Sequence, residues 1–90
     1  MKWRYFGRHS GVNTYEIYRC PDNGKSLFDT GQQIERVQKN GGWEADEKGA
    51  LGLSNEKSQG WFDENDDEIP EAEALALIVC WQREGWPGRS

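Results

Sequence analysis

The sequence predicts an α+β domain in which a small antiparallel sheet of three to five strands carries one C-terminal α-helix on one face. The N-terminal half is rich in aromatic and β-branched residues, and turn-forming residues interrupt it at short intervals. Residues 70–84 instead show the apolar periodicity of an amphipathic helix. Ninety residues suit a single domain over 1–90, with a mainly β part (1–48), a loop with an acidic run (49–69), the helix (70–84) and a tail (85–90).

The first thirty residues are expected to form strands. Aromatic and β-branched residues indicate strands at 2–6 and 12–20, separated by a glycine-bounded turn at 7–11. Residues 21–24 (PDNG) predict a second turn, because proline presets φ, Asx side chains bond to nearby amides, and glycine accepts positive φ. Residues 25–30 would then return as the next strand, so that the hairpin over 12–30 is the β element predicted most directly.

The strand at 12–20 has large side chains on both faces. Alternation places Tyr15 and Ile17 on one face and Glu16, Tyr18 and Cys20 on the other. A strand with apolar surface on both faces is typical of an inner position in the sheet.

The middle of the chain leaves alternatives open. Residues 34–38 are compatible with a short strand or with one helical turn. The pair Asn40-Gly41 favours the strand, because Asn-Gly is a strong hairpin signal and residues 43–45 would return. Residues 49–60 contain three glycines and few apolar residues, so a loop is expected there.

The C-terminal helix is the clearest predicted element. Pro70 suits a first helical turn, and Glu71 and Glu73 follow where the helix dipole favours negative charge. Gly85 is a natural C-terminal stop. One side of this helix is apolar and is expected to pack on the sheet. The expected core comprises Phe6, Tyr15, Ile17, Phe28, Leu75, Ile78 and Trp81.

The sequence excludes several classes of protein. No apolar run approaches the roughly 18 residues of a membrane span, no apolar segment of a secretory signal follows the start, and no period repeats along the chain. Cys20 and Cys80 form no metal-ligand pattern. We therefore expect free thiols in the reducing cytoplasm, and the alternative is a disulfide that joins the sheet to the helix.

Charge is unevenly distributed along the chain. The net charge is −5, yet residues 1–25 carry five basic and two acidic side chains, whereas the rest carries six basic and fourteen acidic ones. Acidic residues are most concentrated at 63–73, a segment without Lys or Arg. An EF-hand loop starting at Asp63 fails, because Glu68 stands where glycine is needed and Ala74 where the bidentate Glu is needed. We predict no metal and no cofactor.

The acidic run and the aromatic pair before it form the leading candidate site. Clustered carboxylates repel one another unless a basic partner neutralises them. Trp61 and Phe62 either pin this loop to the core or form a recognition patch, since Trp is enriched among interface hot spots. The leading hypothesis is a non-enzymatic protein-interaction module that binds a basic surface of another protein as a small inhibitor or DNA mimic. Its expected contact residues are Trp61, Phe62, Asp63, Glu64, Asp66, Asp67, Glu68 and Glu71.

The alternative hypothesis is a nucleic-acid-binding fold that uses the basic, aromatic N-terminal hairpin. Aromatic rings would stack on bases and basic groups would neutralise phosphates. The expected contact residues are Lys2, Arg4, Tyr5, Arg8 and Arg19. The negative net charge makes nucleic acid the less favoured partner.

Homodimerisation, ligand binding and catalysis are further alternatives. The domain is a candidate homodimer in which the basic and acidic segments meet across subunits, or it holds a small ligand among its aromatic side chains. Enzyme chemistry has little support, because His9 is the only histidine, lies in the predicted turn, and has no specific spacing to Ser10 or Cys20. No membrane association is predicted.

Three segments resemble a group of known proteins. The aromatic, basic start WRYF (3–6), the segment YEIYR (15–19) and the run DDEIPEAEA (66–74) are similar to those of small, uncharacterised acidic proteins of actinobacteria and their phages. In such proteins Ser or Thr often caps the final helix where Pro70 stands here. The resemblance implies a bacterial or phage cytoplasmic protein and brings no catalytic or binding residues.

Overall fold

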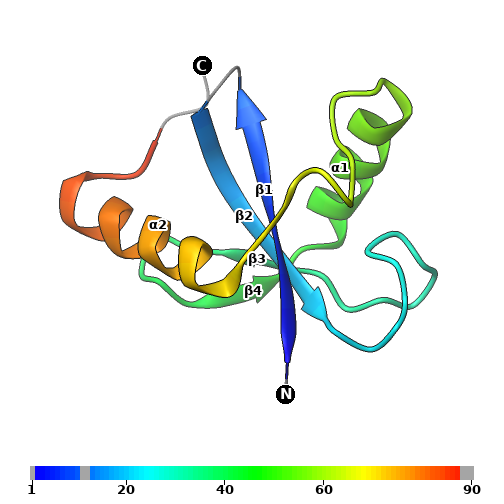
Figure 1. Cartoon of the computed structure of the whole chain (residues 1–90), viewed down its shortest axis with the longest axis horizontal. Helices are drawn as coiled ribbons and strands as arrows, with labels where there is room; N and C mark the ends of the chain where they lie inside the picture. The colour runs from blue at the N-terminus through cyan, green and yellow to red at the C-terminus, as the bar shows by residue number, and fades with distance from the viewer. Residues whose placement is uncertain (1, 11–12, 88–90) are drawn as a thin grey trace.

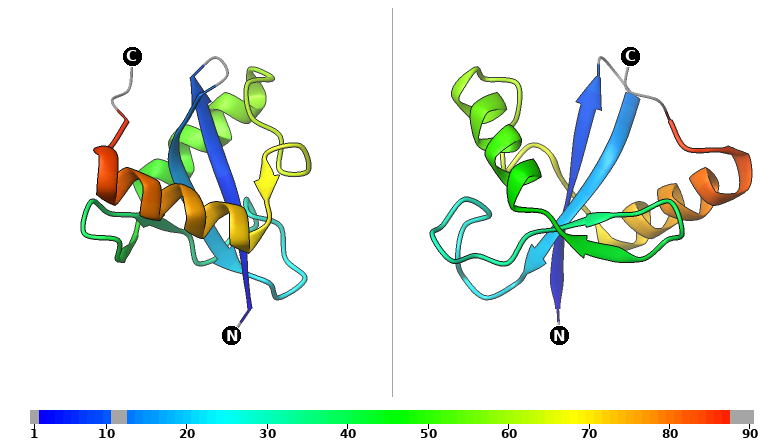
Figure 2. Two further views of the ribbon diagram at one scale, coloured as in Figure 1. Left: turned by 60° about the vertical axis from the view of Figure 1, so that its left-hand side comes forward. Right: turned by 180° about the vertical axis from the view of Figure 1, so that it is seen from behind.

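The computed structural model describes residues 2–10 and 13–87 and has the α+β fold that the sequence predicts (Figure 1). In this part of the chain, five strands form one open antiparallel sheet with the order β4-β3-β2-β1-β5. The strands are β1 (Trp3–Ser10), β2 (Asn13–Pro21), β3 (Glu35–Val37), β4 (Trp43–Ala45) and β5 (Glu68–Ile69). The helices are α1 (Glu47–Ser58) and α2 (Glu71–Glu84), which lie on opposite sides of the β1–β2 hairpin (Figure 2).

β1 and β2 pair along their whole described length and form the centre of the sheet. The turn predicted at 7–11 is therefore wrong for residues 7–10, which belong to β1, while Gly11 lies outside the described residues. Gly7 serves close packing, because a Cβ at this position would come within 3.1 Å of the Thr14 methyl group. The prediction that β2 is an inner strand is confirmed, since it lies between β1 and β3.

Two apolar clusters lie on the two faces of this hairpin. The cluster that includes α2 consists of Tyr5, Ile17, Val37, Ala74, Ile78 and Trp81. The cluster that includes α1 consists of Phe6, Tyr18, Cys20, Leu27, Leu53 and Phe62. The alternation predicted for β2 is confirmed, because Ile17 belongs to one cluster and Tyr18 and Cys20 belong to the other.

The return strand predicted at 25–30 is wrong, and so is the hairpin over 12–30. Residues 27–28 and 30–31 form turns instead. The Asp29 carboxylate accepts a hydrogen bond from the Ser26 amide at 2.9 Å, and the Asp29 amide donates to the Ser26 carbonyl at 3.2 Å. These local bonds compete with strand pairing. The neighbours of β2 are β1 and β3, and the strands expected near 34–38 and 43–45 are present as the antiparallel pair β3 and β4.

The loop predicted at 49–60 is wrong for most of its length, because α1 occupies residues 47–58. A second helix therefore joins the single helix that the sequence predicts. Glycine disfavours helix by about 1 kcal/mol per residue, but tertiary contacts offset this cost. Leu53 is fully buried in the cluster on the α1 side. The Arg8 guanidinium lies against Gly52, where an added Cβ would stand 3.5 Å from Nη2.

α2 closely follows the prediction of its bounds. It begins after Pro70, which has an extended backbone, and ends at Gly85, whose amide donates to the Trp81 carbonyl at 2.8 Å. Five of the seven expected core residues are buried: Phe6, Tyr15, Ile17, Ile78 and Trp81. The other two are wrong, because Phe28 is only partly buried and Leu75 is 43% exposed.

The two cysteines are free, as expected. Cys20 is buried in the cluster on the α1 side, whereas Cys80 is exposed on α2, so the two thiols do not face each other. Burial raises the pKa of Cys20 to about 11. No helix in the described ranges combines the length and apolar character that a membrane crossing requires.

Two neighbouring side chains on α2 test the packing of this helix. Ile78 is buried, whereas Val79 is 52% exposed. We expect Ile78→Ala to lower the free energy of unfolding by about 2–5 kcal/mol because it opens a cavity. Val79→Ala should change it by less than about 0.5 kcal/mol. Urea unfolding of both variants measures this difference, and equal effects would contradict the packing of α2.

Two glycines near α1 should respond in opposite directions to the same substitution. Gly52→Ala should stabilise the domain by about 0.5–1 kcal/mol, because alanine favours helix and its Cβ would find ordinary contact distances to Arg8. Gly60→Ala should destabilise it by about 1 kcal/mol, because Gly60 has a φ of +80°. Thermal unfolding of the two variants tests whether α1 is a helix in solution, and destabilisation by Gly52→Ala would count against it.

Candidate functional site

Trp61 is presented at the end of α1. The Trp61 amide donates to the Glu56 carbonyl at 2.8 Å, and the Gly60 amide donates to the Lys57 carbonyl at 3.1 Å. With Gly60 at positive φ, this is a Schellman motif, which satisfies the last carbonyls of a helix. The chain direction after α1 is thereby fixed, and the Trp61 side chain stands 73% exposed.

Phe62 anchors the same segment to the core. It is 4% exposed, and its ring centroid lies 6.4 Å from that of Phe6 and 5.9 Å from that of Phe28. Adjacent residues of the predicted aromatic pair therefore have different environments. Phe62 lies in the core, while Trp61 faces solvent.

The acidic run closes into a short hydrogen-bonded loop. The Asp67 amide donates to the Asp63 carbonyl at 2.8 Å, and the Asp67 carboxylate accepts from the Asp63 amide at 2.9 Å. The Asp63 carboxylate accepts from the amides of Asn65 and Asp66 at 2.7 and 3.2 Å. This Asx-type arrangement satisfies carboxylates with backbone donors. The loop thus holds a defined shape without an external ligand.

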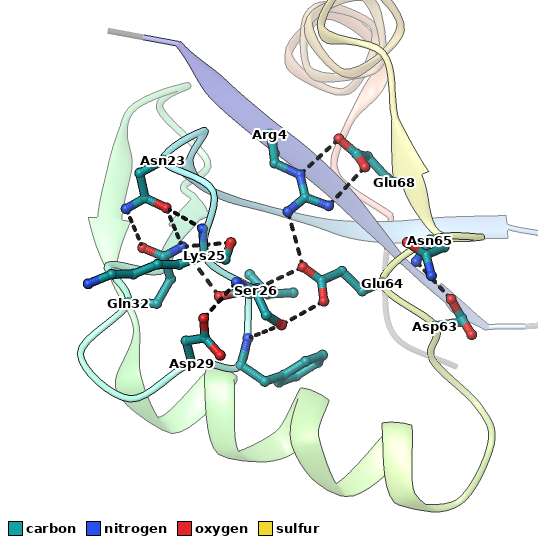
Figure 3. A network of polar contacts seen from close by, with 12 residues as sticks. Arg4, Asn23, Lys25, Ser26, Asp29, Gln32, Asp63, Glu64, Asn65 and Glu68 are labelled. Atoms are coloured by element: carbon teal, nitrogen blue, oxygen red, sulfur yellow. Dashed lines mark hydrogen bonds and ion pairs between the residues drawn. The ribbon is translucent and has the colours of Figure 1, made fainter.

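Glu64 points inward and ties the acidic loop to residues 26–27 (Figure 3). Its carboxylate accepts hydrogen bonds from the Leu27 amide at 2.8 Å, the Ser26 hydroxyl at 2.7 Å and Arg4 Nη1 at 3.1 Å. Burial alone would raise the pKa of Glu64, but the bonds from Leu27 and Ser26 and the charge of Arg4 together lower this pKa below its usual value. The carboxylate is therefore held in its charged form.

The basic first strand and the acidic loop meet within one chain. Arg4 forms a fork with Glu68, with Nε–Oε2 and Nη2–Oε1 distances of 3.2 and 3.0 Å (Figure 3). His9 Nε2 lies 3.1 Å from a carboxylate oxygen of Asp67. The two oppositely charged segments of the sequence are thus partly neutralised by each other, so their charge alone gives no reason for them to meet across subunits.

Most residues proposed for nucleic-acid contact have partners inside the domain. Tyr5 is buried. Arg19 pairs with Glu35 at 2.7 Å, and its guanidinium lies between the rings of Trp3 and Trp43, at 3.9 and 4.3 Å from their centroids.

Arg8 is also held within the domain. It pairs with Glu16 at 3.2 Å, and its Nε lies 2.6 Å from Glu56 in an ion pair without hydrogen-bond alignment. Arg4 is engaged with Glu64 and Glu68. Of the proposed set, Lys2 remains an exposed cation.

His9 has a structural environment. Its Nδ1 lies 3.0 Å from the Thr14 hydroxyl, and its other ring nitrogen faces Asp67. Arg4 is the cross-strand partner of Cys20 and lies five residues before His9 in β1. At the rise of a β-strand, this spacing separates Cys20 from His9 by roughly 16 Å. A nucleophile–base pair between Cys20 and His9 is therefore not formed.

The described residues provide no grouping of three or more His, Cys, Asp or Glu side chains that would hold a metal ion. Comparisons with protein-family models, curated proteins and solved structures yield no match to this chain.

The structure divides the predicted contact residues into two groups. Phe62, Glu64 and Asp67 face the interior or other side chains and shape the loop. The exposed members are Trp61, Asp63, Asp66, Glu68 and Glu71; we call them the Trp61 surface. Sequence reasoning missed the role of α1, although the Gly60-Trp61 step after a possible helix was a usable C-terminal signal.

Glu64 offers a test of this loop. Glu64→Ala should lower the free energy of unfolding by about 2–3 kcal/mol at pH 7, because it leaves the Leu27 amide without its acceptor. Asp66→Ala, which removes an exposed carboxylate, should cost less than about 0.5 kcal/mol.

The same substitution predicts a dependence on pH. Because folding lowers the pKa of Glu64, its stabilisation is present above the unfolded pKa of about 4.3 and is lost as the pH falls through the folded value. Urea unfolding of wild type and Glu64→Ala should therefore differ less at pH 3 than at pH 7. A constant difference would contradict the assigned contacts.

Proposed function

We propose that this chain is a non-enzymatic protein-interaction domain that binds a basic partner through the Trp61 surface. The observation that carries the proposal is the 73% exposure of Trp61 on a loop that the domain itself holds in place. A small domain with few apolar residues forgoes burial free energy when it leaves a large indole exposed. Covering it with a partner would contribute on the order of 3 kcal/mol.

Preorganisation supports this proposal. The Schellman motif, the buried Phe62 ring and the Glu64 contacts restrict the loop before any partner arrives. Binding then requires little further ordering of the backbone, so more of the contact energy remains as affinity. Phe62, Glu64 and Asp67 would act as positioning residues for the exposed members.

Charge defines the kind of partner. Asp63, Asp66 and Glu71 are exposed, and the chain carries a net charge of −5. Exposed carboxylates in the segment that follows Trp61 would steer a basic surface toward this part of the domain. A nucleic-acid-binding protein has such a surface, and against it the domain would act as a small inhibitor or a DNA mimic. The free cysteines suit a reducing compartment such as the cytoplasm.

Nucleic-acid binding through the N-terminal hairpin has less support. Arg4, Arg8 and Arg19 would each have to leave carboxylate partners before they could neutralise phosphates. Nuclease treatment in an affinity-capture experiment distinguishes this alternative from binding to a basic protein.

Affinity capture from a lysate of the source organism tests the proposal, with half of the lysate treated with nuclease. The baits are wild type, Trp61→Ala and Leu51→Ala. Leu51 is a matched control, because it is also 73% exposed but lies within α1. We expect wild type and Leu51→Ala to retain the same basic protein from both halves of the lysate. Trp61→Ala should bind this protein roughly a hundredfold more weakly.

Two outcomes would contradict this function. Equal retention by Trp61→Ala would remove the indole from the interface. Retention that disappears after nuclease treatment would instead favour the N-terminal hairpin and nucleic acid.

A further inference from the structure

α1 is held to the domain by less apolar surface than α2. Of the α1 residues whose exposure the structure describes, Leu53 is the only buried one, whereas α2 buries three residues. The sequence of α1 also contains Gly49 and Gly52, and glycine is the poorest helix former apart from proline. A helix of 12 residues is marginal in water even with favourable residues. α1 therefore depends on few contacts with the rest of the chain.

The contact between α1 and the hairpin includes an ion pair. Glu56 Oε2 lies 2.6 Å from Arg8 Nε, and these side chains are 16% and 11% exposed. On the hairpin itself, Arg8 also contacts the Glu16 carboxylate at 3.2 Å and the Tyr18 hydroxyl at 3.3 Å. Separation of α1 would therefore leave Arg8 with a carboxylate partner and give Glu56 to water. Such an opening costs less than one that leaves a buried charge unpaired.

The apolar cluster on the α1 side does not depend on α1 for most of its members. Only one of its six buried residues, Leu53, belongs to the helix. Leu27 is fully buried, and the Phe62 ring, which follows α1 in sequence, packs against the rings of Phe6 and Phe28. These residues continue to cover the hairpin when α1 leaves.

Both ends of the segment are fixed by contacts outside α1. Before the helix, the Asp46 amide donates to the Ile34 carbonyl at 3.1 Å, and the Asp46 carboxylate lies 3.2 Å from Arg36 Nε. After the helix, Phe62 is buried. An extended chain reaches up to about 3.3 Å per residue, compared with about 1.5 Å in a helix. Residues 47–61 can therefore unfold while both ends stay in place.

We propose that residues 47–61 form a local switch, in which α1 opens from the hairpin while the sheet and α2 stay folded. Trp61 belongs to this unit, because its amide donates to the Glu56 carbonyl at 2.8 Å and the bond is lost when the helix unfolds. A partner that binds the Trp61 surface would favour the closed state, since a ligand shifts an equilibrium toward the state it binds better. This consequence rests on the proposed function, whereas the opening itself does not.

Native-state hydrogen exchange, followed by NMR on the free domain, tests the opening. After correction for intrinsic rates, the amides of α1 and of Trp61 should exchange at least roughly tenfold faster than those in the middle of α2. The Leu27 amide, which donates to Glu64 at 2.8 Å, should exchange with the slow group. Low concentrations of urea should accelerate exchange steeply in α2 and weakly in α1, because opening α1 exposes less surface than global unfolding.

Two core substitutions separate the opening of α1 from global unfolding. Ile78→Ala removes packing that is present in both the closed and the open state. It should accelerate exchange in α2 by more than about thirtyfold and leave exchange in α1 unchanged. Leu53→Ala removes packing that only the closed state has. It should accelerate α1 and Trp61 by more than about thirtyfold, and α2 as well, because the closed state is also the reference for global unfolding.

The contact between Arg8 and Glu56 has a matched control on the other helix. Glu56→Gln removes the charge of a largely shielded pair and should accelerate exchange in α1 by roughly three- to thirtyfold. Glu73→Gln removes an exposed carboxylate of α2 and should leave exchange in α1 unchanged.

Two results would overturn the proposal. Equal acceleration of α1 and α2 by Ile78→Ala would mean that the domain unfolds as one unit. Exchange in α1 that Leu53→Ala leaves unchanged would mean that this contact does not hold the helix. If Ile78→Ala does not fold, the urea dependence of wild type decides, because equal slopes for the two helices contradict a separate opening.

Discussion

The central β1–β2 hairpin has large apolar side chains on both faces, and each face must be covered. Phe6 and Tyr18 point to one side of the hairpin, while Tyr5 and Ile17 point to the other. A single helix covers only one of these faces. The need to bury the second face explains why a glycine-containing segment becomes α1 and why Leu27 and Phe62 fold inward from loops. The arrangement of the whole domain follows from this two-sided strand pair (Figure 2).

Ion pairs then hold the covering segments in place around the hairpin. Arg4 connects β1 to the acidic loop, and Arg8 connects it to Glu56 of α1. Partly buried arginines of this kind must have carboxylate partners, because an unpaired charge away from water is costly. Much of the acidic excess in the sequence therefore has a structural role. The proposed recognition surface therefore depends on a smaller set of exposed carboxylates and on the exposed indole of Trp61.

The sequence predicts best those elements whose signals are local. The bounds of α2 follow from Pro70, Gly85 and the helical periodicity between them, and the two faces of β2 follow from alternation. α1 escaped prediction because tertiary contacts stabilise it, namely the Arg8 guanidinium against Gly52 and the apolar cluster in which Leu53 is buried. The sequence also could not predict that Trp61 is exposed and Phe62 is buried, since both residues are large and apolar. Which of the two is buried depends on the rings of Phe6 and Phe28.

The outer strands of the sheet are much shorter than the inner ones. β4 has three residues and β5 has two, whereas β1 and β2 have eight and nine. An edge strand offers unpaired amides and carbonyls on which a strand from another molecule can add, and long edges lead to aggregation. Here the long, apolar strands are enclosed and the exposed edges offer few backbone groups. The short edge strands therefore allow the domain to be kept at high concentration without polymerising through its sheet.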